Sequence, residues 1–269
     1  MKKRIWIPIC VLLMTSCQQK EIQEKKVPEE NSVEKVDKKE DVFTNLTEQG
    51  IKEKIIKFLS RKEDHILSDS SFKFYKGQMN RDQVEDWVVT VNELQFAKKQ
   101  LEKIGNLGAI DYGYLGNYNH IFVIDGATGK WNGRPIGSSA LAPLEIEIDY
   151  VNSDQYQVAK IFYRVGTAKF IGIYNSSIPS FQEIFKWELY NLSDNTANGQ
   201  PTGRIIEFKG DEGSPKSIEI FEAKVINFDD KAFVDNMYEY EPQLQKTAKR
   251  PIHVFEYQLA EGKFGENNK

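Results

Sequence analysis

The stretch that decides the fold is FKFYKGQMNRDQVEDWVVTV, residues 72–91. Residues 72–76 alternate apolar with polar or mixed side chains, and the run that follows Asp86 is β-branched and aromatic. Alternation with a period of two is typical of a half-buried strand, and β-branched runs bounded by polar residues are typical of strands as well. The stretch therefore predicts two β-strands joined by the polar loop between them.

Most of the chain that follows this stretch consists of short β-rich segments. A strand is predicted from His120 to Asp125, and DGATGK after it gives a turn. The further segments are IEID (146–149), KIFYRV (160–165), KFIGIY (169–174), IFKWEL (184–189), GRIIEFK (203–209), SIEIFEAKVINF (217–228) and HVFEYQLAEGKF (253–264). Because turn signals such as Gly166 and residues 210–216 separate them, we expect successive antiparallel hairpins.

Three segments switch to the helical period, in which apolar residues recur every three or four positions. The first is residues 46–61, which begin at a possible cap, Thr47, and place on one face Ile51, Ile55, Phe58 and Leu59. The second is residues 92–104, which end at Gly105 and place on one face Leu94, Ala97, Leu101 and Ile104. The third is residues 229–240, whose inward residues are Phe233, Val234, Met237 and Tyr238. The predicted fold class is mainly β (α+β): an antiparallel β meander of imperfect propeller-like or sandwich-like repeats with two or three capping helices.

Composition excludes several classes of protein. Residues 46–269 are long enough to form a β-rich globular domain without disulfides. The two cysteines of the chain are Cys10 and Cys17, so this domain has no disulfide framework, thiolate metal site or cysteine nucleophile. Loss of the three cations of residues 1–16 takes the net charge from −4 to −7. A net negative charge argues against nucleic acid as a partner, because that affinity depends on cations that neutralise phosphates.

The amino terminus has the order of a secretory signal. Cations at residues 2–4 precede an apolar run, residues 5–14, that is too short to cross a bilayer as a permanent helix. The sequence LMTSC (13–17) then resembles the lipobox of bacterial lipoproteins. The resemblance implies a signal peptide over residues 1–16, cleavage before Cys17, diacylglycerol on the Cys17 sulfur and acylation of its new amino group. The alternative is an ordinary secretory signal in which Cys17 is incidental.

A tether is predicted between the lipid and the domain. Residues 18–41 mix charges of both signs with few apolar residues, a composition that cannot offset the entropy of ordering. Residues 17–45 are therefore predicted to be a lipidated cysteine and a disordered tether that holds the domain about 25–30 Å from the membrane. The resemblance to lipoproteins implies that the protein is located in the cell envelope, at the outer membrane, on either its periplasmic or its surface face.

The loop inside the first stretch has the spacing of a calcium loop. Gln78, Asn80, Asp82 and Asp86 occupy relative positions 1, 3, 5 and 9, at which a tight loop turns successive oxygens toward one centre. The segment resembles the FG-GAP and VCBS-type repeats. The resemblance implies calcium as a cofactor, with these four side chains and the Val84 carbonyl as ligands.

Departures from the repeat pattern lower the expected calcium affinity. Gln78 replaces a charged ligand, and Arg81 and Gln83 replace two glycines that allow the sharp turn. The alternative is a loop without metal, closed by its own hydrogen bonds in the manner of Asx-turns. Residues 146–166 resemble a possible second copy, in which Asn152 and Asp154 match Asn80 and Asp82. Such a copy would have lost the outer ligands, because Tyr150 and Val158 stand at those positions.

A binding surface is predicted in GNLGAIDYGYLGNYNH, residues 105–120. Glycines there surround Tyr112, Tyr114 and Tyr118, and tyrosines on a flexible backbone give a large contact area at small entropic cost. These tyrosines are candidate residues for binding a partner. The alternative is that they pack over the edge of the sheet.

The sequence contains no signature of a known catalytic site. A nucleophile elbow, a His-Glu-x-x-His pair, a phosphate loop and a dinucleotide fingerprint are all missing from it, and His65, His120 and His253 are scattered. The first functional hypothesis is a lipid-anchored, non-catalytic module that binds an envelope protein or glycan. The second is an envelope hydrolase acting on carbohydrate or lipid, motivated by paired acids such as Glu145 and Glu147 on one strand face.

Overall fold

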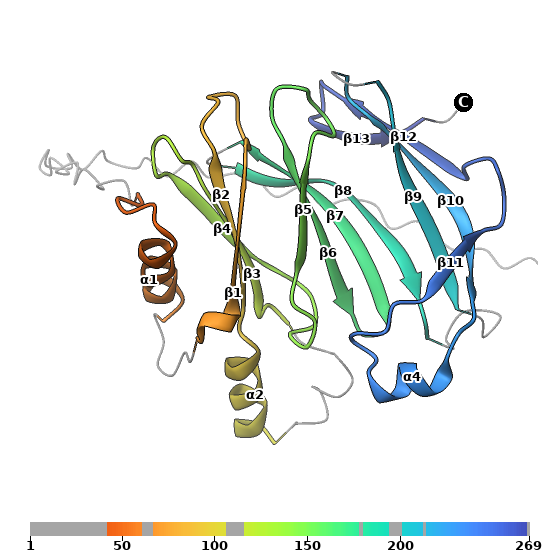
Figure 1. Ribbon diagram of the computed structural model, residues 1–269, viewed down its shortest axis with the longest axis horizontal. Helices are drawn as coiled ribbons and strands as arrows, with labels where there is room; N and C mark the ends of the chain where they lie inside the picture. The colour runs from red at the N-terminus through yellow and green to blue at the C-terminus, as the bar shows by residue number, and fades with distance from the viewer. Residues whose placement is uncertain are drawn as a thin grey trace, which may run out of the picture. The chain divides into compact units, whose positions relative to one another are not determined.

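Two antiparallel sheets contain the strands of the described chain (Figure 1). The computed structural model describes residues 42–60, 67–105, 116–177, 180–193, 201–211 and 214–267, all within the unit Glu40–Lys269. The predicted signal peptide, Cys17 and most of the predicted tether lie outside the described residues. No helix of the described part is long and apolar enough to cross a membrane.

The first sheet is a four-stranded meander that begins with the predicted pair of strands. Its strands are β1 (Phe72–Gly77), β2 (Asp86–Asn92), β3 (Asn119–Ile124) and β4 (Trp131–Ile136), in that order. The polar loop between β1 and β2 was predicted from its composition, and the strand predicted from His120 to Asp125 is β3. Chain order and sheet order agree, although the connection from β2 to β3 spans residues 93–118 and contains a helix.

The second sheet follows the predicted hairpins in chain order from β5 to β10. Its strands are β5 (Glu145–Asp149), β6 (Val158–Val165), β7 (Ala168–Ser177), β8 (Ser180–Asn191), β9 (Thr202–Lys209), β10 (Ser217–Ile226), β12 (His253–Gln258) and β13 (Lys263–Glu266). The strand β11 (Gln243–Lys246) pairs with β10 beside β12. The mainly β, α+β fold class is therefore confirmed, with an antiparallel meander as its central element.

Three α-helices accompany the sheets in the described residues. The helix α1 (Glu48–Leu59) begins at Thr47, whose hydroxyl accepts a hydrogen bond from the Gly50 amide at 3.2 Å, as predicted. The helix α2 (Leu94–Lys103) buries Ala97 and Leu101. Ile104 was predicted to share that buried face, but it caps the helix and is 71% exposed.

The third helix is shorter than the sequence predicts. The helix α4 (Asp230–Asp235) ends at Asn236, which leaves the helical conformation. Phe233 packs between the rings of Phe228 and Tyr240 at 5.5 and 5.8 Å. Val234 is 78% exposed, so its predicted inward position was wrong. A single turn and a half of helix has room for one inward aromatic residue.

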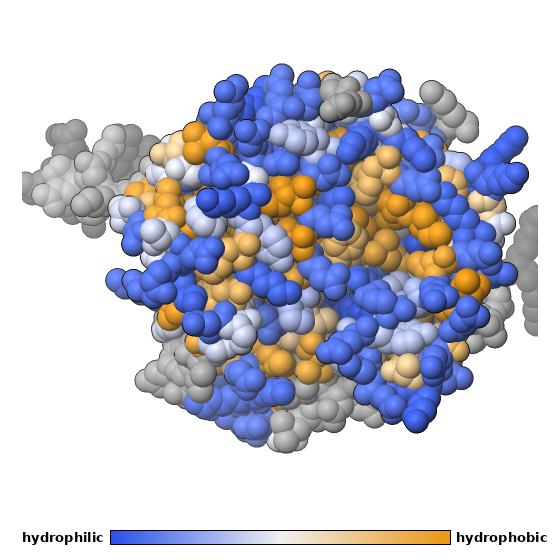
Figure 2. Space-filling view, viewed as in Figure 1, coloured by the Kyte–Doolittle hydropathy of each residue, from blue (hydrophilic) through white to orange (hydrophobic). Residues whose placement is uncertain are grey.

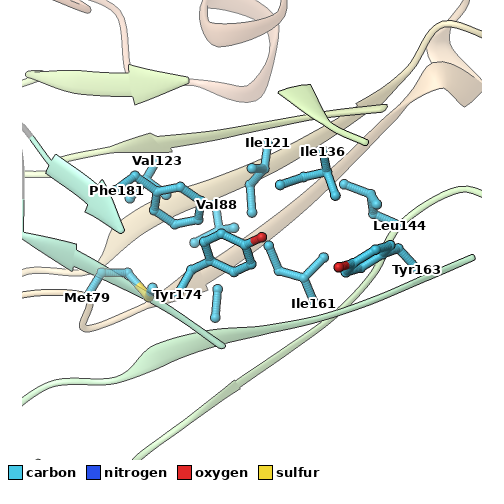
Figure 3. Packing of buried hydrophobic residues seen from close by; sticks show 11 residues of the cluster. Met79, Val88, Ile121, Val123, Ile136, Leu144, Ile161, Tyr163, Tyr174 and Phe181 are labelled. Carbon is cyan, nitrogen blue, oxygen red and sulfur yellow. The ribbon is translucent and has the colours of Figure 1, made fainter. Parts of the chain in front are cut away.

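The main core lies between the two sheets, which pack face to face (Figure 3). The four-stranded sheet contributes Val88, Ile121, Val123 and Ile136, and the second sheet contributes Ala159, Ile161, Tyr163, Tyr174 and Phe181. A valine, isoleucine or phenylalanine side chain contributes about 1.5–3 kcal/mol when it is fully buried. The sandwich-like alternative within the predicted fold class describes this packing.

The outer face of the four-stranded sheet is covered by α1. Val89, Val91, Phe122 and Ile124 alternate with the residues of the main core along β2 and β3, and they pack against Ile51 and Ile55 of α1. Because both faces of the sheet are covered, β2 and β3 are buried along most of their length. The first helix is therefore one of the capping helices that the predicted fold class includes.

Candidate functional site

A polar cleft of about 590 Å³ lies where loops of both sheets meet. The β1–β2 loop, the turn after β3, the β5–β6 loop and the end of β7 supply its walls. Its lining residues are Met79, Asn80, Arg81, Asp82, Asp125, Tyr156, Asn175 and Ser176. A hollow of about 650 Å³ beside α1 borders residues 42–45, at the start of the described chain, and groups no acids comparable to those of the cleft.

Hydrogen bonds between the two sheets fix the walls of the cleft. The Gln78 amide donates to Gln157 Oε1 at 2.8 Å, and the Gln157 amide donates to the Gln78 carbonyl at 2.6 Å. The Ser176 hydroxyl donates to the Met79 carbonyl at 3.2 Å. Because each bond joins the β1–β2 loop to the second sheet, the cleft is largely preformed.

Asp86 is the buried anchor of the cleft and has no exposed surface. Its Oδ2 accepts from the Met79 amide at 3.0 Å, and its Oδ1 accepts from the Gly126 amide at 2.8 Å. Burial raises the pKa of Asp86 to about 6; the charges of Asp125 and Asp82 add to this rise, and the two amide donors oppose it. Asp86 therefore ties the β1–β2 loop to the turn after β3.

Gly126 can approach Asp86 because it has no side chain. A Cβ at this position would overlap the Glu85 carbonyl oxygen. The close approach of these two backbones therefore requires glycine, and it places the Gly126 amide against the carboxylate.

The β1–β2 loop is closed by Asx-type hydrogen bonds, as one alternative predicted. The Asp82 amide donates to Asn80 Oδ1 at 2.8 Å, and the Val84 amide donates to Asp82 Oδ1 at 2.9 Å. Gln83 has a φ of 64°, a left-handed conformation that favours glycine. The loop therefore turns sharply at Gln83 without a glycine there.

Asp125 is a residue of the cleft that the sequence analysis did not select. Its Oδ1 accepts from the amide and hydroxyl of Thr128 at 2.6 and 2.8 Å, and its Oδ2 accepts from Asn80 Nδ2 at 3.2 Å. The phrase DGATGK gave the signal for the turn. It gave no signal that the turn would lie beside Asp82 and Asp86, because that proximity depends on the pairing of β2 with β3.

The structure gathers part of the predicted ligand set. Carboxylate oxygens of Asp82, Asp86 and Asp125 lie within 4.8 Å of one another. Asn80 directs its amide nitrogen toward Asp125 at 3.2 Å and Asp86 at 3.5 Å, so it presents a donor where a cation needs an oxygen. Gln78 Oε1 accepts from the Tyr150 hydroxyl at 3.1 Å and lies apart from the acids.

Calcium requires six or more oxygen ligands. The grouped carboxylates are three, those of Asp82, Asp86 and Asp125, and each offers one ligand atom. We therefore expect calcium to bind no more tightly than about 1 mM, the weak end of the range for extracellular modules. Isothermal titration calorimetry of the chain from residue 42 measures this directly. Asp82→Ala is the control for any heat that appears. A dissociation constant below about 0.1 mM that Asp82→Ala abolishes would contradict the expectation.

Tyr118 is the one predicted tyrosine within the described residues, and it does not line the cleft. Tyr112 and Tyr114 lie outside the described residues, so their role in binding a partner stays a prediction. Tyr118 packs against α2, with its ring 6.1 Å from that of Phe96. It precedes β3, whereas Asp125 follows β3, so the two lie at opposite ends of one strand. Tyr118 thus packs against a helix, whereas the alternative placed it over the edge of the sheet.

The described histidines and the acids of β5 are engaged in ion pairs. His120 pairs with Glu93 at 2.7 Å, and His253 pairs with Glu266 at 2.6 Å. The acids along β5 pair with lysines: Glu145 with Lys169, Glu147 with Lys160, and Asp149 with Lys160 and Lys216. These contacts give structural partners to the residues from which a catalytic hypothesis was drawn, and His65 lies outside the described residues.

No protein-family model matches this chain, and no curated protein or solved structure is significantly similar to it. The cleft and the amino-terminal sequence are therefore the two observations from which a function is inferred.

Proposed function

We propose that this protein is a lipid-anchored, non-catalytic binding module of the cell envelope, and that its cleft binds a glycan. The observation that supports the binding role is the cleft itself. Its volume of about 590 Å³ lies within the range of ligand sites, and polar side chains from both sheets converge on it. The observation that supports the anchor is the sequence LMTSC that ends at Cys17.

The chemistry of the lining favours a hydroxyl-rich ligand. Asp82 and Asp125 accept hydrogen bonds, Asn175 both donates and accepts, and Tyr156 adds an aromatic ring and a hydroxyl. A sugar presents donors and acceptors together with apolar C–H faces that pack on an aromatic ring. Arg81 lies 5.6 Å from the centre of the Tyr156 ring and is exposed, so it can move aside for such a ligand.

A hydrolase finds less support in the same cleft. Asp86 has the raised pKa of a general acid, but it is fully buried and both of its oxygens accept from backbone amides. A general acid must come within hydrogen-bonding distance of the bond that it protonates. The raised pKa of Asp86 therefore reflects a structural role, and we favour binding without catalysis.

A panel of immobilised envelope and extracellular oligosaccharides tests the glycan proposal. We expect Tyr156→Ala to weaken the binding of a recognised glycan at least about tenfold, because it removes the aromatic wall of the cleft. Tyr150→Ala is the matched control, since Tyr150 belongs to the same loop but does not line the cleft. Absence of binding across the panel, or equal losses in both variants, would remove the cleft from consideration.

The anchor is tested by mass spectrometry of the mature amino terminus. We expect diacylglycerol and an added acyl group on Cys17, and release of a soluble product when Cys17→Ser blocks the modification. An unmodified terminus at Cys17 would contradict the anchor. It would leave the binding proposal for the cleft unaffected, because no residue of the cleft belongs to the amino-terminal segment.

A further inference from the structure

The strands β8 and β9 are neighbours that scarcely pair. The strand β8 has twelve residues and β9 has eight, yet their ladder consists of Tyr190 with Gly203 and Asn191 with Thr202. The strand β8 pairs along its length with β7, and β9 pairs along its length with β10. Each therefore has a long edge without a β-ladder partner among the described residues, and the two edges face the same opening.

The bulges of β8 explain why the two strands separate. The register between β7 and β8 shifts at two places, which leaves Leu189 and Ile184 as extra residues on β8. A bulge bends the strand that contains it and increases its twist. Because Leu189 comes directly before Tyr190, the bend lies where the ladder with β9 stops. The opening thus begins beside a bulge of β8.

The opening has an apolar inner face. Trp187 and Leu189 of β8 and Ile206 and Phe208 of β9 are half-buried and pack on the core within the second sheet. Hydrophobic surface is visible in the region enclosed by β5, β8, β9 and β10 (Figure 2). At the far end, Phe264 of β13 packs on Phe185, with ring centres 6.0 Å apart.

The outer face of the opening is charged. Lys186 lies over the Tyr163 and Phe170 rings on the opposite side of β8 from Trp187. Glu207 forms ion pairs with Lys246 and Lys209 on the opposite side of β9 from Ile206. A strand that entered the opening would therefore meet apolar side chains on one face and charged side chains on the other.

We propose that the opening between β8 and β9 binds an extended peptide segment of a partner protein by strand addition. The free edges of Lys186–Leu189 and Arg204–Phe208 supply N–H and C=O groups that an extended backbone can satisfy. Side chains of a strand alternate between its two faces, so the matching segment alternates apolar residues with polar or charged ones. The free edges are long enough for about four or five residues.

The test uses a fluorescein-labelled nonapeptide in which valine alternates with lysine or glutamate, and the full mature chain. We expect saturable binding in fluorescence anisotropy. A matched peptide with proline at alternate valines lacks those N–H donors and should bind at least about tenfold more weakly. Ile206→Thr should weaken binding by a similar factor, whereas Ile205→Thr, on the opposite face of the same strand, should leave it unchanged.

Hydrogen exchange on the wild-type chain keeps the proposal testable if Ile206→Thr folds poorly. Amides of residues 186–189 and 204–208 should exchange more slowly when the nonapeptide is present. Unchanged exchange there, equal binding of the proline peptide, or no binding up to about 1 mM would overturn the proposal. A dimer in analytical ultracentrifugation without peptide, with these same amides protected, would overturn it as well, because a second copy would then fill the opening.

Discussion

Replacing Arg164 by methionine is expected to lower the free energy of unfolding by about 3–5 kcal/mol. Arg164 is 3% exposed, and its guanidinium donates to the Met237 carbonyl at 2.8 Å, to the Tyr240 carbonyl and to the Tyr190 hydroxyl. It also pairs with Glu241 at 3.2 Å. Methionine keeps much of the side-chain volume but leaves these acceptors without their donor.

The loss of stability in Arg164→Met should be concentrated in the segment that follows α4. Met237, Tyr240 and Glu241 belong to this segment, and Arg164 of β6 bonds to all three of them. Glu241 is held in addition by Lys169 and Tyr190 of the same sheet. We therefore expect faster hydrogen exchange over residues 236–242 in Arg164→Met than in the wild type. Lysine at this position should rescue little, because its ammonium cannot reproduce the fork of the guanidinium.

Arg204→Met is the matched control. Arg204 has the same side chain and lines a hollow with Glu241, but it donates to its neighbour, the Gly203 carbonyl, and has no carboxylate within ion-pair distance in the described chain. Its replacement should change the free energy of unfolding by less than about 1 kcal/mol, as measured by urea titration. Equal losses in the two variants would show that general loss of charge, and not the contacts of Arg164, sets the stability.

The same attachment makes part of the stability depend on acid. Burial alone would raise the pKa of Glu241, but the charges of Lys169 and Arg164 outweigh it and hold that pKa below its ordinary value. A carboxyl group of this kind stabilises the fold above its ordinary pKa, and the stabilisation is lost as the pH falls through the lowered value. In Arg164→Met this contribution should be smaller, because one of the two cations is gone.

Local signals were enough to predict the elements of this fold. The alternation at residues 72–76 and the β-branched run after Asp86 each gave one strand, and Thr47 marked the start of α1. These features depend on neighbours a few residues away, which the sequence displays directly. The shortening of α4 was not predicted, because Asn236 leaves the helix while the apolar spacing continues to Tyr238.

Long-range geometry is what the sequence could not provide. The second sheet curls, so that the ring centres of Trp187 of β8 and Phe255 of β12 lie 5.4 Å apart. In the sheet itself, β9 and β10 lie between these two strands. The bulges at Ile184 and Leu189 that bend β8 have no signal in the composition of that strand. Pairing of β12 with β10, across α4 and β11, likewise depends on contacts far apart in the chain.

The candidate site shows the same division between local and distant information. The Asx-turns of Asn80 and Asp82 follow from their spacing, and so does the turn at Gln83. Asp125 joins the site through the pairing of β2 with β3, and Gln78 leaves it for Tyr150 of the second sheet. The sequence motif therefore predicted the loop correctly, whereas the tertiary structure determines which side chains gather in the site.

The pH dependence of stability should contain a contribution from Asp86 of about 2–3 kcal/mol. Its pKa of about 6 in the folded chain lies above the ordinary value of 3.8, so the folded state binds this proton more tightly than the unfolded state does. The stabilisation is fully present below about pH 4 and is lost as the pH rises through about 6. Asp86 therefore acts in the opposite direction to Glu241.

Comparison with Asp86→Asn isolates this contribution. Asparagine does not titrate, so the wild-type free energy of unfolding minus that of Asp86→Asn should fall by about 2–3 kcal/mol between pH 4 and pH 7. Titration of all other groups cancels in this difference to first order. Urea unfolding at a series of pH values, with EDTA present to remove divalent cations, measures it.

A second variant tests the cause of the shift. The charge of Asp82 helps to raise the pKa of Asp86, and Asp82 is exposed, so Asp82→Asn should leave the fold intact and move the window to lower pH. Burial is the larger cause of the raised pKa, so most of the decrease in the stability difference between pH 4 and pH 7 should remain in the Asp82→Asn background. A difference that stays flat from pH 4 to pH 7 would mean that Asp86 is well solvated in solution, and the backbone contacts that tie Met79 and Gly126 to it could then not close the cleft.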